Sequence, residues 1–420
     1  MKNLCLSLIC MLFTTVNSSF AQDGPAILTE IKNHVVPIDT GGFYKGHNEY
    51  KQSVFNKLRK FKVLGIGEQT HGTHEFFQTK KALIITLSRE YGYNLVGLEA
   101  PFAEVENLNG YVLEGRGDLK EILKSFRQYT FECSEFESLV ESLKDDNKHA
   151  VSKIKFFGFD FQSPFGSLEY LYKTDQLRKG LNAKKIQGLI KAYTKLNNEL
   201  YSHSIDPSTF SELNAISKEV IDNMQANSNK DSQLNQYIES YNQFLKLNNL
   251  VLTNDSLSMS KLSLLRDSLM ALNIVNNVTG ENNIILWAHN AHLQKTPSIY
   301  SKSVGYFLKK KLKESYAVVG QTTSTGYFTG FNPTAGKVTN RNIIVKPQNT
   351  DFEYYFSSTG IPIFFLESSK VKNNRSPAYS YRLLGYGVTD RQFAHGNLLA
   401  DFDFIIHTET TTGNNSFYLK

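Results

Sequence analysis

Two short segments of the chain combine histidines with carboxylate side chains at spacings that suit acid–base chemistry. The first is 67–75, with the sequence Gly-Glu-Gln-Thr-His-Gly-Thr-His-Glu. Glu68 lies three residues before His71, where a carboxylate can hold the imidazole in one tautomer. A general base needs this arrangement to take a proton from water. Gly72 follows directly and relaxes the backbone, so that His71 can project from the turn.

The second segment is 287–292, with the sequence Trp-Ala-His-Asn-Ala-His. If a helical turn begins there, His289 and His292 lie on one face of it, because residues three apart are neighbours on a helix. The two segments together predict a site that contains several histidines and at least one carboxylate.

Both segments follow short apolar runs, and two further carboxylates do the same. Glu68, Glu99, Asp160 and His289 each close such a run. The runs are 62–67, 94–98, 155–159, 284–288 and 316–320. Runs of this length without alternation are typical of strands buried on both faces, and amphipathic helical stretches separate them here. The sequence therefore predicts an α/β fold with a central largely parallel or mixed sheet, flanking helices and a helical insertion.

Ligands of such sheets bind at the carboxyl ends of the strands, so we expect the four strand-end residues in one site. Taken singly, each of them is better explained as a cap of the following helix or as a partner of a nearby lysine, whereas the set of four favours a site. Lys80 is a further candidate, because it falls in the middle of the apolar face of the helix that follows the first segment. Either it has an anionic partner or ligand inside, or its stem packs on the core while the ammonium reaches water.

The N-terminus and the middle of the chain differ in composition from the rest. Residues 1–21 have a positive start, a short apolar stretch and small residues before Gln22, which predicts a secretory signal peptide and an exported, periplasmic or secreted protein. The mature chain, 22–420, is expected to be one domain with a helical insertion at about 167–277. Cys133 is then the one remaining cysteine, so no intrachain disulfide is expected.

Composition excludes several classes of protein. The chain has 420 residues, of which 40% are hydrophobic and 12% aromatic, enough for a packed core. A net charge of +6 without a concentrated basic face argues against nucleic acid as a partner. Outside the first residues no apolar run is long enough for a stable membrane span. The sequence does not indicate an oligomeric state.

The motif residues together resemble the erythromycin esterase family. The resemblance rests on Gly67-Glu68-x-x-His71-Gly72-x-x-Glu75, on Glu99 after the next strand, and on Trp287-x-His289-Asn290-x-His292. Supporting matches are Gly158-Phe159-Asp160, Arg266-Asp267-x-x-Met270-Ala271-x-Asn273 and Phe402-Asp403, and the resemblance runs from about residue 45 to about residue 410.

Enzymes of that family hydrolyse the macrolactone ester of macrolide antibiotics. The resemblance implies that His71 is the general base and that Glu68, Glu99, His289 and His292 complete the catalytic set. The family's macrolide esterases usually have an arginine on the helix after the motif, where this sequence has Lys80. A lysine keeps the charge but lacks the planar fork of a guanidinium.

The expected function is therefore an exported esterase that acts on a small-molecule ester or lactone, with a macrolide as one candidate, and that needs no cofactor and no metal. Lys80 and Asp160 are the expected substrate-binding residues. The chain has no Gly-x-Ser-x-Gly elbow, which argues against a serine nucleophile. Two alternatives stay open. The same histidines with Glu68 or Glu99 would also suit a zinc-type hydrolase, and a non-catalytic periplasmic protein could use the same cleft to bind a small molecule.

Overall fold

A computed structural model describes residues 20–44, 49–178, 180–199, 207–226, 231–252, 259–297, 301–372 and 379–419. The predicted signal segment, 1–21, lies almost entirely outside these residues, and its cleavage stays a prediction. No helix in the described ranges combines the length and the hydropathy that a bilayer crossing requires.

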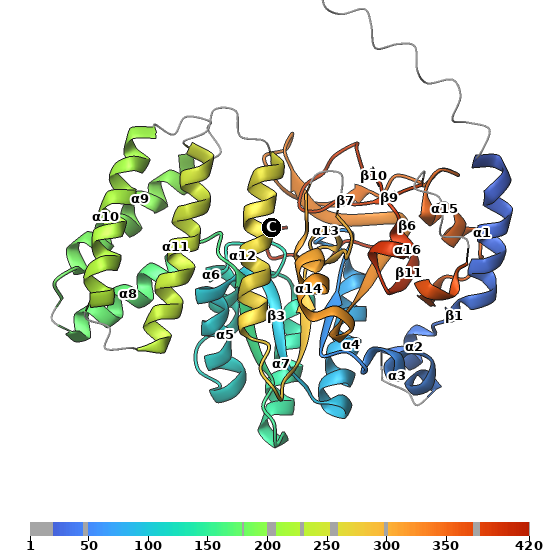
Figure 1. Cartoon of the computed structure of the whole chain (residues 1–420), viewed down its shortest axis with the longest axis horizontal. Coiled ribbons are helices and arrows are strands. Elements are labelled where there is room, and N and C mark those ends of the chain that lie inside the picture. The colour runs from blue at the N-terminus through green and yellow to red at the C-terminus, as the bar shows by residue number, and fades with distance from the viewer. Residues whose placement is uncertain are drawn as a thin grey trace, which may run out of the picture.

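The centre of the molecule is a mixed sheet, which in the described residues has nine strands (Figure 1). Eight of them form a continuous path in the order β1-β8-β11-β6-β2-β5-β3-β4, and β7 pairs with β6. Their bounds are β1 Val36–Pro37, β2 Val63–Ile66, β3 Tyr93–Pro101, β4 Lys155–Asp160, β5 Asn283–Trp287, β6 Tyr316–Asn332, β7 Lys337–Ile343, β8 Ile363–Glu367 and β11 Phe404–Thr411. A separate hairpin contains β9 (Ser380–Arg382) and β10 (Phe393–His395).

Six neighbouring strands of this sheet run parallel, from β11 through β6, β2, β5 and β3 to β4. Strands β8 and β7 pair antiparallel with their neighbours β11 and β6. The predicted α/β class with a largely parallel or mixed sheet is confirmed. Because β2, β5 and β3 are adjacent and parallel, the residues that follow them meet at one edge of the sheet.

Each face of the sheet is covered by its own set of helices. Leu64 and Ile66 of β2 pack into one core cluster and Val63 into the other, as the alternation of side chains along a strand requires. The first face carries α4 (His74–Tyr91), α5 (Phe102–Glu114), α6 (Leu119–Ser125) and α7 (Ser134–His149). The second carries α1 (Phe20–His34), α12 (Met259–Asn276), α14 (Val304–Leu312), α15 (Phe352–Ser357) and α16 (Leu398–Asp401). Short helices α2 (Thr40–Phe43) and α3 (Asn56–Leu58) add to the first face.

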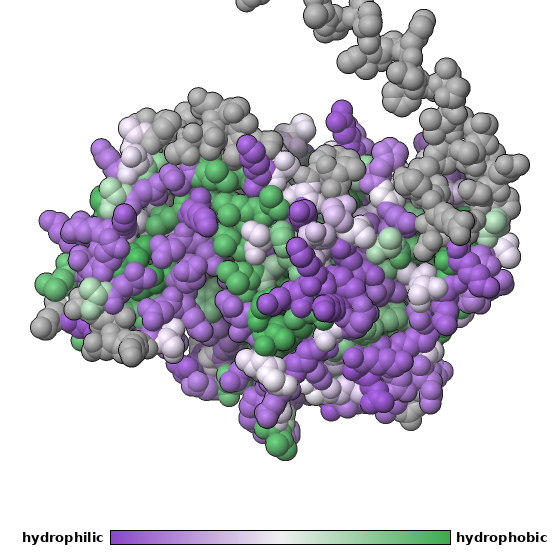
Figure 2. Space-filling view, viewed as in Figure 1, coloured by the Kyte–Doolittle hydropathy of each residue, from purple (hydrophilic) through white to green (hydrophobic). Residues whose placement is uncertain are grey.

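The described residues between β4 and α12 form a helical lobe that stands beside the sheet (Figure 1). Its helices are α8 (Phe165–Arg178), α9 (Ala183–Glu199), α10 (Pro207–Ala226) and α11 (Ser232–Leu252). The apolar face of α9 is buried in the lobe's own core, where Ile186 and Leu189 pack in one cluster with side chains from α10 and α11. On the face shown in Figure 2, apolar residues gather over α12, which exposes Leu264 and Leu272 between the lobe and the sheet.

One part of the sheet differs from the sequence prediction. The sequence predicted a strand only over the apolar run 316–320, but β6 continues to Asn332 and returns as β7. Threonine is β-branched and suits a strand, and Thr322, Thr323 and Thr325 pair with β11. Gly326 then adopts a φ of 109°, a backbone conformation that is strained for any residue with a side chain. At this point β6 stops pairing with β11 and begins to pair with β7.

Candidate active site

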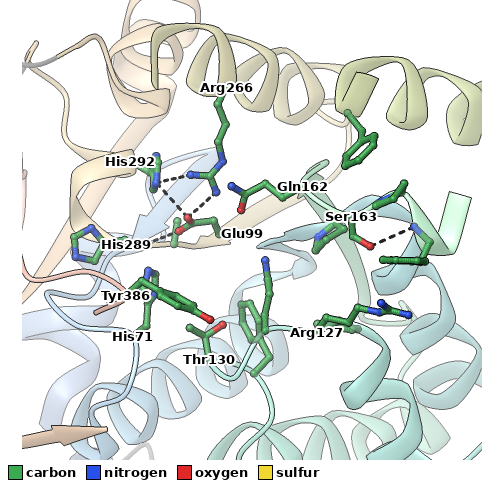
Figure 3. Close-up of a pocket in the computed structure, with 18 of the residues that line it drawn as sticks. His71, Glu99, Arg127, Thr130, Gln162, Ser163, Arg266, His289, His292 and Tyr386 are labelled. Carbon is green, nitrogen blue, oxygen red and sulfur yellow. Dashed lines mark hydrogen bonds and ion pairs between the residues drawn. The ribbon is translucent and has the colours of Figure 1, made fainter. Parts of the chain in front are cut away.

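A cavity of about 610 Å³ lies where β2, β3 and β5 end, between the sheet and the helical lobe. All five residues of the predicted catalytic set line it: Glu68, His71, Glu99, His289 and His292. The two motif segments are joined directly, because the Asn290 N–H donates to the Glu68 carbonyl at 2.8 Å. Figure 3 shows the three histidines and Glu99 around one end of this cavity.

The backbone around His71 depends on Gly72. A Cβ on this residue would lie 1.8 Å from the carbonyl oxygen of Thr329, so no other side chain fits without moving β6. The Thr329 N–H in turn donates to the Gly72 carbonyl at 2.9 Å. The absence of a side chain at Gly72 therefore lets its backbone approach that of Thr329 closely, and this contact holds the turn that contains His71 against the sheet.

His71 and Glu68 form a directed pair. His71 Nδ1 lies 2.8 Å from Glu68 Oε1. An ionised carboxylate only accepts hydrogen bonds, so Nδ1 carries the proton and Nε2 of the neutral ring has a free lone pair. The His71 side chain is 14% exposed, whereas the Glu68 side chain is 2% exposed. A neutral His71 thus presents a basic nitrogen on the cavity side of a buried carboxylate.

Lys80 lies behind Glu68, away from the cavity wall. Its side chain is fully buried, its Nζ donates to Glu68 Oε2 at 2.7 Å, and it lies 4.3 Å from the centre of the Trp287 ring. Burial lowers the pKa of Lys80 to about 8 despite the attraction of Glu68. Burial alone would raise the pKa of Glu68, but Lys80 and His71 together hold it below its usual value. Of the two alternatives for Lys80, the structure shows the buried ion pair.

Glu99 is the acceptor for three groups on the opposite side of the site. Its Oε2 accepts the His289 backbone N–H at 2.9 Å, and its Oε1 lies 3.1 Å from Arg266 Nη2 and 3.2 Å from His292 Nε2. Burial opposes the charge on Glu99, but His292 and Arg266 hold its pKa well below the usual range. The carboxylate stays ionised and fixes its three donors, as Figure 3 shows.

His292 is held as a cation. Its Nδ1 lies 2.7 Å from Asp267 Oδ1, and its Nε2 faces Glu99. Burial disfavours the charge, but the two carboxylates outweigh burial and raise the pKa of His292 to about 10. Both ring nitrogens therefore carry protons at neutral pH.

His289 has the opposite protonation state. The Ala291 N–H donates to His289 Nδ1 at 3.2 Å, so the ring proton is on Nε2, which lies 3.0 Å from the Gln69 carbonyl. Burial and the neighbouring His71 lower the pKa of His289 to about 3. Its ring lies 5.1 Å from that of His71, centre to centre. His289 is thus neutral and lies beside His71, and both of its ring nitrogens contact backbone groups.

Arg266 and Asp267 are site residues that the predicted set omitted. Arg266 Nη2 and Nε contact the two oxygens of Asp160 at 2.6 Å and 3.3 Å, and the arginine lines the cavity. Asp160 is fully buried and reaches the cavity only through Arg266. Both omitted residues lie on α12, at the end of the predicted helical insertion. Arg266 and Asp267 appear in the sequence as part of the family pattern. The spacing of residues in the sequence does not predict, however, that the helix carrying them packs beside the ends of the strands.

The donor set does not suit a metal ion. A histidine ligand must offer a lone pair, yet His292 is protonated on both nitrogens and His289 uses both for backbone contacts. Across the described residues no group of three or more histidine, cysteine, aspartate or glutamate side chains is placed to hold a metal.

The far part of the cavity is apolar and comes from the helical lobe. Tyr193, Leu196, Phe210 and Phe244 line it from α9, α10 and α11. The cavity therefore has a charged end at the sheet and an aromatic end at the lobe. This division suits a small molecule that places one polar group against His71 and a larger apolar body against the lobe.

The fold and this cavity define an α/β protein that takes a small molecule at the carboxyl edge of a parallel sheet. The chain belongs to the erythromycin esterase family, whose pattern it matches over residues 89–411, more than half of its length. It is therefore a hydrolase of the esterase type with a small-molecule substrate. The matched range begins after the His71 segment, so the role of His71 rests on geometry.

Three known proteins resemble this chain at low sequence identity. Erythromycin esterase type II of Escherichia coli is 24% identical over 329 residues, which cover 69% of this chain and 77% of that protein. The crystal structure of a succinoglycan biosynthesis protein has a TM-score of 0.75 at 22% identity and covers 94% of this chain and 99% of its own. A mutant of the erythromycin esterase EreC in its open conformation has a TM-score of 0.70 at 18% identity, covering 91% and 99%. The two solved structures support the fold.

Proposed function

We propose that this protein hydrolyses a carboxylic ester or lactone by direct attack of water, with His71 as the general base. The observation that carries the proposal is the contact between His71 Nδ1 and Glu68 at 2.8 Å, which leaves Nε2 free on the cavity side. A macrolide lactone is one candidate substrate, because the family includes macrolide esterases.

The reaction begins with a water molecule between His71 Nε2 and the ester carbonyl carbon. His71 takes a proton from this water as its oxygen attacks the carbon. The imidazolium that forms keeps its contact with the ionised Glu68. The tetrahedral intermediate then expels the alcohol oxygen, which receives the proton back from His71, and the products are a carboxylic acid and an alcohol.

Arg266 and His292 stabilise the negative charge that develops on the carbonyl oxygen. Both are cations, both line the cavity, and their side chains are 17% and 19% exposed. Glu99, Asp160 and Asp267 hold them in place before substrate arrives. Fixed donors of this kind need no reorganisation during the reaction, which makes their stabilisation effective.

The test is turnover of a panel of activated esters, simple lactones and macrolides by the mature protein, followed by mass spectrometry for the gain of one water. We expect His71→Ala to lower turnover by about 10²–10⁴-fold. The matched control is His74→Ala, because His74 contacts Glu135 and does not line the cavity. Full activity of His71→Ala, or loss of wild-type activity with a chelator, would refute the mechanism and restore the metal-dependent alternative. Tight binding without turnover would favour the binding protein.

We also propose that the hydrolase acts outside the cytoplasm, after removal of residues 1–21. Support comes from the positive start, the short apolar stretch and Ala21 before Gln22. Intact-mass measurement of the protein from the extracellular or periplasmic fraction tests this, and a mass that still includes Cys5 would contradict it.

A further inference from the structure

Arg127 is a cation in the cavity wall that the proposed mechanism does not use. It lies on the loop between α6 and α7, lines the cavity and is exposed. Its backbone adopts a φ of 54°, the left-handed region that residues other than glycine rarely enter. Figure 3 shows Arg127 and His71 at opposite sides of the view, with Thr130 between them. The arginine therefore belongs to the part of the cavity away from the base.

The guanidinium is fixed by an aromatic ring and not by a carboxylate. Its central carbon lies 3.5 Å from the centre of the Phe165 ring, a close stacking contact. Phe165 is buried and starts α8, at the base of the helical lobe. Within the described residues no carboxylate lies within 4.0 Å of an Arg127 nitrogen. A guanidinium stacked through its face keeps its edge N–H groups available for an acceptor.

The other ionised groups of the cavity already have partners. Glu68 pairs with Lys80, and Glu99 pairs with Arg266 and His292. Away from these clusters the described lining is uncharged, with the amides of Gln128 and Asn248 and the rings of the lobe. Gln128 Oε1 is buried and lacks a hydrogen-bond partner. Arg127 is thus the unpaired charge at the far end of a cavity whose near end carries the hydrolytic groups.

We propose that Arg127 binds a carboxylate of the substrate, so that this protein prefers esters whose apolar body carries a carboxylate away from the scissile bond. The planar fork of arginine matches the two oxygens of a carboxylate, and one cation balances one negative charge. An ester that carries an amine at this place meets a like charge instead. The inference rests on the proposed function, because it names the substrate class of the same site.

The preference is measured with pairs of substrates that differ in one charge. Each pair is the 4-nitrophenyl monoester of a dicarboxylic acid, with its second carboxylate either free or capped as a methyl ester, in a series of increasing chain length. We expect wild-type protein to hydrolyse both, with kcat/KM higher for the free carboxylate at the chain length that spans the cavity. Arg127→Gln should reduce this ratio by about 10- to 100-fold, the contribution of a charge-assisted hydrogen bond. Its kcat/KM for the capped ester should fall by much less than its kcat/KM for the free carboxylate.

Two further variants test the cause. Arg127→Lys keeps the charge without the fork and should retain part of the preference. Arg116→Gln removes an exposed arginine that pairs with Glu114 and does not line the cavity, and it should behave as wild type. The inference is overturned if the ratio of kcat/KM for the free carboxylate to that for the capped ester never exceeds one in wild type. It is also overturned if Arg127→Gln keeps the wild-type ratio or loses activity equally on both esters. Failure of wild type to hydrolyse either ester would instead count against the proposed function.

Discussion

Replacing Lys80 with methionine tests how the buried ion pair supports the base. The change keeps an unbranched apolar stem on α4 and removes the ammonium that lies 2.7 Å from Glu68 Oε2. Deleting one partner of a buried pair costs about 3–5 kcal/mol of folding free energy. Because burial lowers the pKa of Lys80 from 10.5 to about 8, wild type already holds this charge at a cost of about 3 kcal/mol. We therefore expect a loss near the lower end, about 3 kcal/mol at pH 7.

The same variant should show a characteristic pH dependence. In wild type the pKa of Glu68 is lowered, so its contribution to stability is present above the unfolded value of 4.5 and is lost as pH falls through the folded pKa. Without Lys80, burial should raise this pKa above 4.5, so Glu68 takes up a proton in the folded state and the variant gains stability relative to wild type as pH falls.

Urea unfolding followed by circular dichroism at pH 7 and pH 5 measures both effects. The stability difference between variant and wild type should be smaller at pH 5. Turnover relative to wild type should fall by about 10-fold or more at pH 5 and by less at pH 7, because a protonated Glu68 no longer orients His71 as the ionised carboxylate does. Lys81→Met is the matched control, since Lys81 contacts Ser138 on the outside of the same helix. An equal stability difference at both pH values, together with unchanged turnover, would refute the coupling between Lys80 and the base.

Three further outcomes are expected. The pKa of His292 is raised to about 10, so its contribution to stability is full below pH 6.5 and is lost as pH rises towards 10. Asp267→Asn removes one of the two carboxylates and should move this loss of stability to lower pH. Thermal unfolding between pH 6 and pH 10 measures the shift. Gly72→Ala should destabilise the fold by about 1–3 kcal/mol or more, because the new Cβ clashes with the backbone of Thr329. Gly188→Ala, in open space on α9, should instead stabilise the fold by about 0.5–1 kcal/mol. Equal effects of the two changes in urea unfolding would contradict the close approach of the two backbones at Gly72. Cys133 is buried and its thiol unpaired, so reductant should leave Tm unchanged and a thiol reagent should react only after unfolding; rapid reaction of the folded protein would be the contrary result.

The parallel part of the fold and the meeting of the motif residues were predictable because both follow from strand ends. A strand buried on both faces leaves an apolar run, and in a parallel sheet the residue after each run lies at the same edge. This reasoning alone places Glu68, Glu99 and His289 near one another. It also placed Asp160 at the same edge, although Asp160 meets the cavity only through Arg266.

The parts that were not predictable depend on elements returning from a distance. Arg266 and Asp267 come from α12, and helical periodicity says which side chains share a face but not which strand end that face meets. The continuation of β6 after Gln321 was missed because glycine and threonine together resemble a loop, although threonine alone favours a strand. The stacking of Arg127 on Phe165 joins a loop to the first residue of α8, and α7 and β4 separate the two in the sequence.

Two histidines three residues apart in one motif reach opposite charge states because their ring nitrogens meet different groups. His292 faces two carboxylates and is a cation, whereas His289 faces backbone groups in a buried position and is neutral. Neither can take a proton from water, because one has no lone pair and the other has no nitrogen turned to the cavity. This elimination adds to the contact with Glu68 as support for His71 as the proposed base. The site has two ion-pair groups, Glu68 with Lys80, and Glu99, Asp160 and Asp267 with Arg266 and His292. Taken together, the carboxylates of the two groups outnumber the cations by one. In the proposed mechanism the proton that His71 takes from water offsets this excess, and the imidazolium forms in contact with the ionised Glu68.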